Sequence, residues 1–217
     1  AAFGECAHVA AILVYVDDFL AVGPRQVLQA LLTQLLHVWK GSNPDFLGKE
    51  PGDVDTLRFL GLDIELGEGE GTWLLHQQSY IHAFLQEMFG DYLKDRRTPG
   101  EPDSYSSKPE HHAQKARVKH PVLRPDQDPL EHTPILRLVG VLLWVSLRTR
   151  PDISWAVARI TRLASSDESR ARVCIKHVAQ YLKWTLHFAL FYEPVTDCKW
   201  HCYTDASWSP EGDYSHQ

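Results

Sequence analysis

The sequence predicts a mixed α+β fold in which a strand-rich front half precedes a helical back half. In the front half, short runs of β-branched and aromatic residues are separated by turn-forming residues. In the back half, apolar residues recur at the spacing of amphipathic helices. The 217 residues are 44% hydrophobic, which is enough for a substantial core. No stretch approaches the about 20 apolar residues of a membrane span, so we expect no membrane partner.

The front half begins with a predicted hairpin over residues 8–23. An apolar run leads into the pair Asp17-Asp18, and a second apolar run follows it. Gly23-Pro24 ends the hairpin, because proline fits the first turn of a helix better than a strand ladder. Six regularly spaced valine and leucine residues then predict an amphipathic helix up to about Lys40.

A second pair of strands is predicted at Leu57–Leu66 and Thr72–His76. The glycine-rich segment 67–71 between them is typical of a hairpin turn. A helix follows over Gln78–Phe89, since its apolar residues fall on one helical face.

Residues 94–131 are polar and rich in proline, which predicts a linker without a core of its own. Four histidines lie in or beside it, with irregular spacing and no accompanying cysteine, so solvated side chains are favoured over a metal cluster. They are His111, His112, His120 and His132. Three helices are predicted after the linker, at 134–147, 151–164 and 168–187, and two strand-like runs at 188–192 and 199–204.

Charge is distributed unevenly along the chain, whose formal net charge is −6. Residues 1–93 carry 4 basic and 13 acidic side chains, a net of −9, and residues 134–185 carry 9 basic and 3 acidic ones, a net of +6. This asymmetry suggests a metal at the acidic half and a polyanion at the basic half, although solvated helix faces would also give the basic excess. The four cysteines show no CxxC spacing, which indicates a reducing, intracellular setting.

The motif Tyr15-Val16-Asp17-Asp18 carries the most chemical information. Two adjacent carboxylates repel each other, and burying them without compensation costs several kcal/mol. At the tip of a buried hairpin they would therefore hold a divalent cation. Mg²⁺ prefers carboxylate and phosphate oxygens, as in nucleotidyl transfer. In isolation, the pair is better explained as an ordinary turn with both aspartates solvated.

Other segments of the sequence favour a functional role for the aspartate pair over an ordinary solvated turn. The motif, a following helix and then FLGLDI at 59–64 resemble a reverse transcriptase palm. Later blocks resemble, more narrowly, the polymerase of copia-type (Pseudoviridae) retrotransposons. These blocks are LVGVLLW at 138–144, RTRPDI at 148–153, VAQYLKWTL at 178–186 and YTDASW at 203–208. Together the blocks cover nearly the whole chain except 94–131, in the order that the family has.

The resemblance implies an α+β chain in four parts. Residues 1–93 would be the C-terminal part of a palm with a primer-grip-like hairpin, and residues 94–131 a polar linker. Residues 132–187 would be a helical region like a thumb or connection, and residues 188–217 the start of an RNase H-like domain.

The resemblance also implies roles for particular residues. In this family the two motif aspartates, here Asp17 and Asp18, help to hold two Mg²⁺ ions during nucleotidyl transfer. Tyr15 would lie near the primer end, and Gln77 or Gln78 would approach the nucleic acid. The implied partners are an RNA or DNA template-primer, dNTPs and the remainder of a Pol polyprotein.

Basic side chains on the thumb-like helices are candidate phosphate contacts. These candidates are Arg148, Arg150 and Arg159, and the alternative is that they pair with Asp152, Asp167 and Glu168. Asp205 resembles the carboxylate on the first strand of an RNase H domain, whose site needs three further carboxylates.

The chain opens without a methionine and runs directly into a predicted strand, which suggests a segment of a longer reading frame. The family's palm uses a third carboxylate from an earlier strand. We therefore expect the chain alone to show neither polymerase nor RNase H activity, with Mg²⁺ bound well only in a complete enzyme. The alternative function is that of a decayed or domesticated element, acting as a non-catalytic nucleic-acid-binding module. The expected location is the cytoplasm, a virus-like particle or the nucleus.

Overall fold

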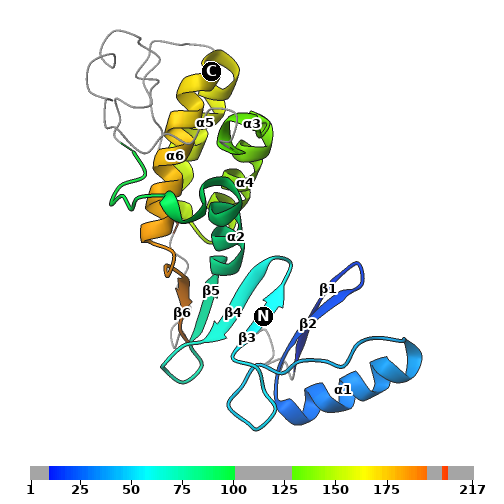
Figure 1. The fold of residues 1–217 in the computed structure, drawn as a ribbon. Helices are drawn as coiled ribbons and strands as arrows, with labels where there is room; N and C mark the ends of the chain where they lie inside the picture. Colours follow the sequence, from blue (N-terminus) through cyan, green and yellow to red (C-terminus); the bar gives the residue numbers. More distant parts are fainter. Residues whose placement is uncertain (1–9, 101–128, 195–201, 205–217) are drawn as a thin grey trace.

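The computed structural model describes residues 10–100, 129–194 and 202–204, and shows a mixed α+β architecture. A two-stranded hairpin and a helix come first, a four-stranded antiparallel sheet follows, and a helical bundle supplies the largest core (Figure 1). None of the helices in the described residues is long and apolar enough to cross a membrane.

The first predicted hairpin is confirmed, and we call it the front hairpin. It consists of β1 (Ala11–Tyr15) and β2 (Asp18–Val22), in antiparallel register. Tyr15 faces Asp18 across a two-residue turn, because Val16 and Asp17 lie between the paired positions. The hairpin is not buried, since every residue of β1 is exposed and β2 has only two half-buried residues. The two motif aspartates thus occupy an exposed turn.

The predicted amphipathic helix is also confirmed, as α1 (Arg25–Val38). It begins directly after Pro24, whose fixed φ suits a helix start. Its leucine-rich face forms as the spacing predicts, but none of its residues is buried. Five of the six apolar positions on this face are half-buried, so the described part of the chain covers the face only in part.

The sheet has the strand order β3-β4-β5-β6, with every neighbouring pair antiparallel. Its strands are β3 (Thr56–Phe59), β4 (Leu62–Leu66), β5 (Trp73–His76) and β6 (Leu190–Tyr192). The single strand predicted over Leu57–Leu66 is wrong, because the chain reverses at Leu60-Gly61. Both residues have positive φ values, 50° and 75°, as a tight hairpin turn requires, and Gly61 adopts this conformation without steric cost.

The helical bundle consists of α2 (Gln78–Phe89), α3 (Pro129–His132), α4 (Ile135–Arg148), α5 (Ser154–Ser166) and α6 (Glu168–Trp184). Short 3-10 turns lie at Gly90–Tyr92 and Pro151–Ile153. The helices predicted for α2, α4, α5 and α6 are confirmed to within a few residues at each end. α3 was not predicted: it begins within the expected linker, and its Leu130 is buried in the core. Apolar side chains from all five helices form one core, in which Leu142, Ile160 and Ile175 are fully buried.

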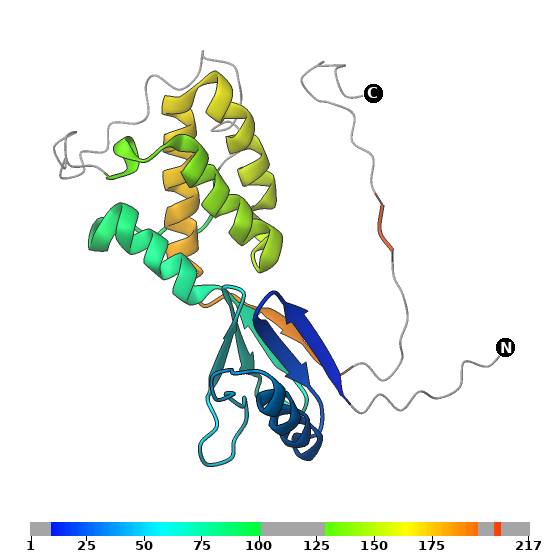
Figure 2. The same ribbon diagram turned by 90° about the vertical axis from the view of Figure 1, so that its right-hand side faces the viewer.

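The bundle lies above the four-stranded sheet in both views, and the front hairpin and α1 lie beside the sheet (Figures 1 and 2). Residues 190–192, expected to open an RNase H-like domain, form β6 and pair with β5 through Leu75 and Leu190. Most of the expected linker, 94–131, lies outside the described residues, and so do residues 199–201 of the expected strand at 199–204; its described residues, 202–204, form no strand.

Candidate functional site

The turn of the front hairpin holds the predicted catalytic residues. Val16 has a φ of 54°, in the left-handed region that β-branched residues rarely adopt. A residue held in that region costs on the order of 1–3 kcal/mol, and such strain concentrates at functional sites. Val16 is 84% exposed and Tyr15 57% exposed. The motif therefore forms a strained, solvent-accessible turn that includes Asp17 and is followed directly by Asp18.

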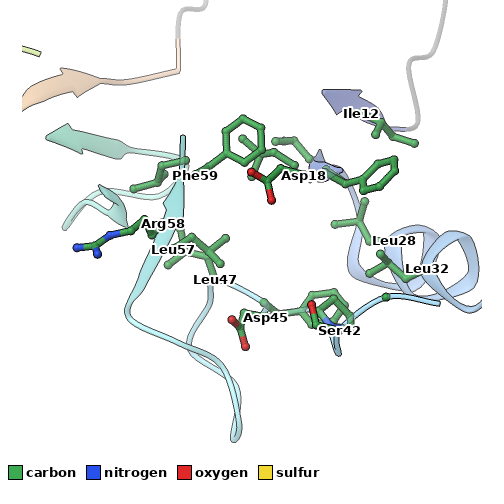
Figure 3. A pocket seen from close by; sticks show the side chains of 18 of the residues that line it. Ile12, Asp18, Leu28, Leu32, Ser42, Asp45, Leu47, Leu57, Arg58 and Phe59 are labelled. Atoms are coloured by element: carbon green, nitrogen blue, oxygen red, sulfur yellow. The ribbon is translucent and has the colours of Figure 1, made fainter. Parts of the chain in front are cut away.

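A cavity of about 1150 Å³ opens beside this turn. Its walls are the front hairpin, α1, residues 39–47 and parts of β3, β4 and β5, and both Asp17 and Asp18 line it. Figure 3 shows the carboxylate of Asp18 directed into the cavity, while the guanidinium of Arg58 points away from it. The remaining lining is largely apolar, including Leu28, Leu57 and Phe59.

An ion pair at the start of α1 holds the loop that forms one wall of this cavity. Arg25 Nη1 donates to Asp53 Oδ2 at 2.9 Å, and the Arg25 guanidinium lies 4.8 Å from the centre of the Phe46 ring. The hydrogen bond from Arg25 lowers the pKa of the Asp53 carboxyl. The loop after α1 is thereby tied back to its first turn, and Phe46 becomes part of the cavity wall.

The acidic residues at the cavity do not make a complete metal site. Asp45 lines the cavity as well, but no group of three or more histidine, cysteine, aspartate or glutamate side chains within the described ranges is arranged so that it could hold a metal ion. Mg²⁺ requires near-octahedral oxygen coordination, and two adjacent carboxylates supply only part of it. The described residues thus provide two candidate ligands, Asp17 and Asp18, and the Mg²⁺ site stays a prediction.

Gln77 and Gln78, the predicted primer-proximal pair, lie where β5 leads into α2. The predicted nucleic-acid contact of Gln77 does not fit its burial, because it is only 1% exposed and its Oε1 accepts a hydrogen bond from Thr149 Oγ1 at 3.0 Å. Gln78 is half-buried, and its backbone N–H donates to His76 Nδ1 at 3.3 Å. Gln77 therefore links the sheet to the bundle instead of facing solvent.

The three arginine candidates differ in their surroundings. Arg148 is exposed at the end of α4 and lies over the Trp144 ring, 4.5 Å from its centre. Arg159 is half-buried on α5. Arg150 is 1% exposed, and its Nε and Nη2 donate to Asp152 at 3.0 and 2.7 Å. Arg150 thus pairs with Asp152, as the alternative expected, and its burial leaves no exposed donor for a phosphate, so that contact stays a prediction. Asp205 lies outside the described residues.

A buried polar cluster on the sheet was missed by the sequence analysis. Asp63 is 2% exposed and accepts hydrogen bonds from Arg58 Nε at 3.0 Å and from the Ser79 backbone N–H at 3.3 Å. Burial alone would raise the pKa of Asp63, but these hydrogen bonds outweigh it and lower that pKa. The carboxylate joins β3, β4 and the start of α2. Its partners lie 5 and 16 residues away, so no local pattern marks it.

Comparison with known proteins finds distant retrotransposon relatives. The chain is 28% identical over 205 residues to a putative transposon Ty5-1 protein of Saccharomyces cerevisiae, which covers 94% of this chain and 59% of that protein. It is 31% identical over 86 residues to a retrovirus-related Pol polyprotein from transposon RE1 of Arabidopsis thaliana, covering 40% of this chain and 6% of the polyprotein. An uncharacterized mitochondrial protein of Arabidopsis thaliana is 30% identical over 61 residues, 28% of this chain and 55% of that protein.

The chain thus spans a little over half of the Ty5-1 protein and a small part of the RE1 polyprotein. No family model matches it, and no solved structure matches it. These comparisons make the chain a distant relative of retrotransposon Pol proteins.

Proposed function

We propose that this chain is the segment of a copia-type reverse transcriptase that runs from the Tyr15–Asp18 motif through a thumb-like bundle. The observation that carries the proposal is the strained turn at this motif, which holds both aspartates at the edge of a large cavity. The relationship to retrotransposon Pol proteins supports the same assignment. The reaction would be RNA-directed DNA synthesis, with Asp17 and Asp18 as catalytic carboxylates.

The chemistry at the turn would need Mg²⁺, which in such enzymes activates the primer 3′-hydroxyl and stabilises the leaving pyrophosphate. Asp17 and Asp18 are the residues of this chain that would contact the ions. Tyr15 is exposed beside them and would lie near the primer end. Because the motif supplies two carboxylates and no third ligand is arranged with them among the described residues, the remaining ligands would come from other polypeptide and from the triphosphate.

The exposed apolar surface would bind the remainder of a Pol polyprotein. Leu13, Val14, Phe19 and Val22 of the front hairpin are each between 48% and 56% exposed. Val14 and Phe19 lie on one face of the hairpin and Leu13 and Val22 on the other, so both faces expose apolar side chains of the kind that mark an interaction site. We infer that further Pol polypeptide covers this surface in the complete enzyme.

The outer face of α4 is the proposed contact with the template-primer. Leu147 is 70% exposed there, and Arg148 adds a positive charge. Gly140 lies on the exposed side of the same helix, and nothing lies within 4 Å of the position that its Cβ would take. A mid-helix glycine without an internal packing reason lets a backbone or sugar–phosphate chain approach closely. Trp144 connects this face to the β3–β4 turn, since it lies 3.9 Å from the Cβ position of Gly61.

Binding of a fluorescently labelled RNA–DNA hybrid tests this contact. Arg148→Ala should weaken binding to the same extent for every hybrid sequence. It should also reduce the slope of log K against the logarithm of salt concentration by about one. Arg137→Ala is the matched control, because Arg137 lies on the same helix but pairs with Glu87 at 2.6 Å. Equal effects of the two substitutions would argue against a contact at Arg148.

Nucleotide incorporation on a primed RNA template tests the catalytic assignment, with the chain expressed within its parent reading frame. Asp17→Asn and Asp18→Asn should each abolish incorporation, because each substitution removes a negatively charged metal ligand. Asp45→Asn, at the same cavity, should leave incorporation in place. Incorporation that survives both motif substitutions would contradict the proposal.

The alternative is a non-catalytic nucleic-acid-binding module derived from a decayed or domesticated element. The incomplete carboxylate set among the described residues favours it. This alternative predicts that the parent protein binds the hybrid with the same dependence on Arg148 but incorporates no nucleotide. The coding sequence upstream distinguishes the two as well, because an open frame encoding a strand with an aspartate would supply the third carboxylate.

A further inference from the structure

The sheet and the helical bundle do not share an apolar core. The core cluster draws its side chains from α2 to α6 and from the segments next to them, and none from β3, β4, β5 or β6. The sheet therefore meets the bundle through a few side chains: Trp144 of α4 lies beside the Gly61 turn, and the backbone N–H of Ser79 in α2 donates to Asp63. Within the described residues, the chain passes between sheet and bundle at two places: from β5 to α2, and from α6 to β6 (Figure 1).

A four-residue turn after α4, Thr149–Asp152, contacts both of these crossings, and we call it the junction turn. At the first crossing, Thr149 Oγ1 donates to Gln77 Oε1 at 3.0 Å, immediately after β5 ends. At the second, Arg150 Nη1 donates to the Thr185 backbone oxygen at 3.1 Å, and its Nη2 donates to Thr185 Oγ1. Thr185 is the residue that ends α6, five residues before β6 begins.

The guanidinium of Arg150 is held on every side. Its remaining donors bind both oxygens of Asp152, and Tyr181 Oη donates to the same carboxylate at 2.8 Å. The rings of Tyr181 and Phe188 lie 5.5 and 5.3 Å from the Arg150 Cζ. Phe188 belongs to the second crossing, so Arg150 contacts this crossing through a hydrogen-bonded residue and a ring. A planar fork of five donors can make this set of contacts, and an ammonium group cannot.

We propose that Arg150 is a positioning residue: the junction turn fixes the four-stranded sheet against the helical bundle by holding both chain crossings at one point. Asp152 and Tyr181 keep the guanidinium paired and oriented, so that its other donors face Thr185. β5 and β6 are neighbours in the sheet, so fastening both of their bundle-side ends fixes the sheet as a whole. This role goes beyond the proposed polymerase function and holds whether or not the chain binds nucleic acid.

Amide hydrogen exchange of the full 217-residue chain tests the proposal with the substitution Arg150→Lys. Lysine keeps the charge but loses the fork, so amides in 73–78 and 185–192 should exchange about tenfold faster. Amides in the centres of α4 and α5 should stay within about twofold of the wild type. The proposal is overturned if the sheet amides are unaffected, and equally if all amides accelerate alike, because Arg150 would then serve general stability only.

Arg172→Lys is the matched control. Arg172 is also a buried arginine, 8% exposed, and it donates to the backbone oxygens of Leu130 and Thr133. These contacts lie wholly within the bundle. The control substitution should loosen 129–133 and leave the sheet amides unchanged; sheet loosening in the control would overturn the special role of Arg150.

The relative position of sheet and bundle can be measured directly. Spin labels are attached at Glu68→Cys, in the exposed β4–β5 loop, and Ser165→Cys, at the exposed end of α5, with the native cysteines replaced. Arg150→Lys should broaden the distance distribution about twofold, and Arg172→Lys should not. If Arg150→Lys does not fold, Thr185→Val removes one acceptor at the second crossing and takes its place. An unchanged distribution in the folded variant would refute the positioning role.

Discussion

The stability of this protein should fall on mild acidification because of one half-buried histidine on α6. His177 has a pKa lowered from 6.5 to about 4, chiefly because burial disfavours the imidazolium, and secondly because Arg96 and Lys176 carry like charge nearby. Its Nδ1 has no hydrogen-bond partner among the described residues. The segment after α2 covers this region, since the Arg96 backbone N–H donates to the Gln180 oxygen at 3.3 Å.

The direction of the pH effect follows from the lowered pKa. The unfolded chain binds a proton at this histidine near pH 6.5, and the folded chain binds it only near pH 4. Acid therefore favours unfolding, and stability is lost as the pH falls from 6.5 toward 4. Between about pH 7 and about pH 5 the loss is about 1–2 kcal/mol, after a reduction for the solvent that a half-buried ring still contacts.

Urea unfolding of the wild type and His177→Gln at these two pH values measures the effect. The wild type should lose about 1–2 kcal/mol more than the variant, because glutamine does not titrate. His82→Gln, at an exposed position on α2, is the control and should keep the wild-type loss. Carboxylates such as Asp152 contribute little in this window, because their lowered pKa values place their titration at lower pH. An equal pH dependence in the wild type and His177→Gln would refute the reasoning.

Three further substitutions test the packing and backbone arguments. Leu142→Ala, at a fully buried position, should destabilise the chain by about 2–5 kcal/mol in urea unfolding, and a loss under about 1 kcal/mol would mean that the core is loosely packed. Gly61→Ala forces a side chain to a φ of 75° and should cost about 1 kcal/mol or more, which a higher Tm would contradict. Gly140→Ala should stabilise α4 by about 0.5–1 kcal/mol yet weaken hybrid binding, and unchanged binding would argue against close approach there.

The helices and the front hairpin could be predicted because their signals are local. The apolar spacing of α2 marks its face within a dozen residues, and its predicted range, Gln78–Phe89, is the observed one. The turn at Leu60-Gly61 was missed because the apolar run continues through it, and only the glycine signalled a reversal.

The candidate site also contains some features that the local sequence predicts and others that it does not. The aspartate pair could be read from the sequence, because its two carboxylates are adjacent and the turn around them is short. Whether an arginine faces solvent cannot be read in this way. Arg148 and Arg150 stand two residues apart in one basic segment, yet one is exposed and the other is 1% exposed. The partners that bury Arg150 lie up to 38 residues further along the chain, at Thr185 and Phe188.

The sequence by itself determined the α+β class, the places of the helices and the carboxylate pair of the motif, because each depends on residues within one or two turns of chain. Only the tertiary structure decided that the front hairpin is exposed, that both aspartates line a cavity and that Arg150 fastens sheet to bundle. Burial and buried hydrogen bonds depend on which distant segments meet. That pairing is set by packing of the whole chain, and a local pattern does not contain it.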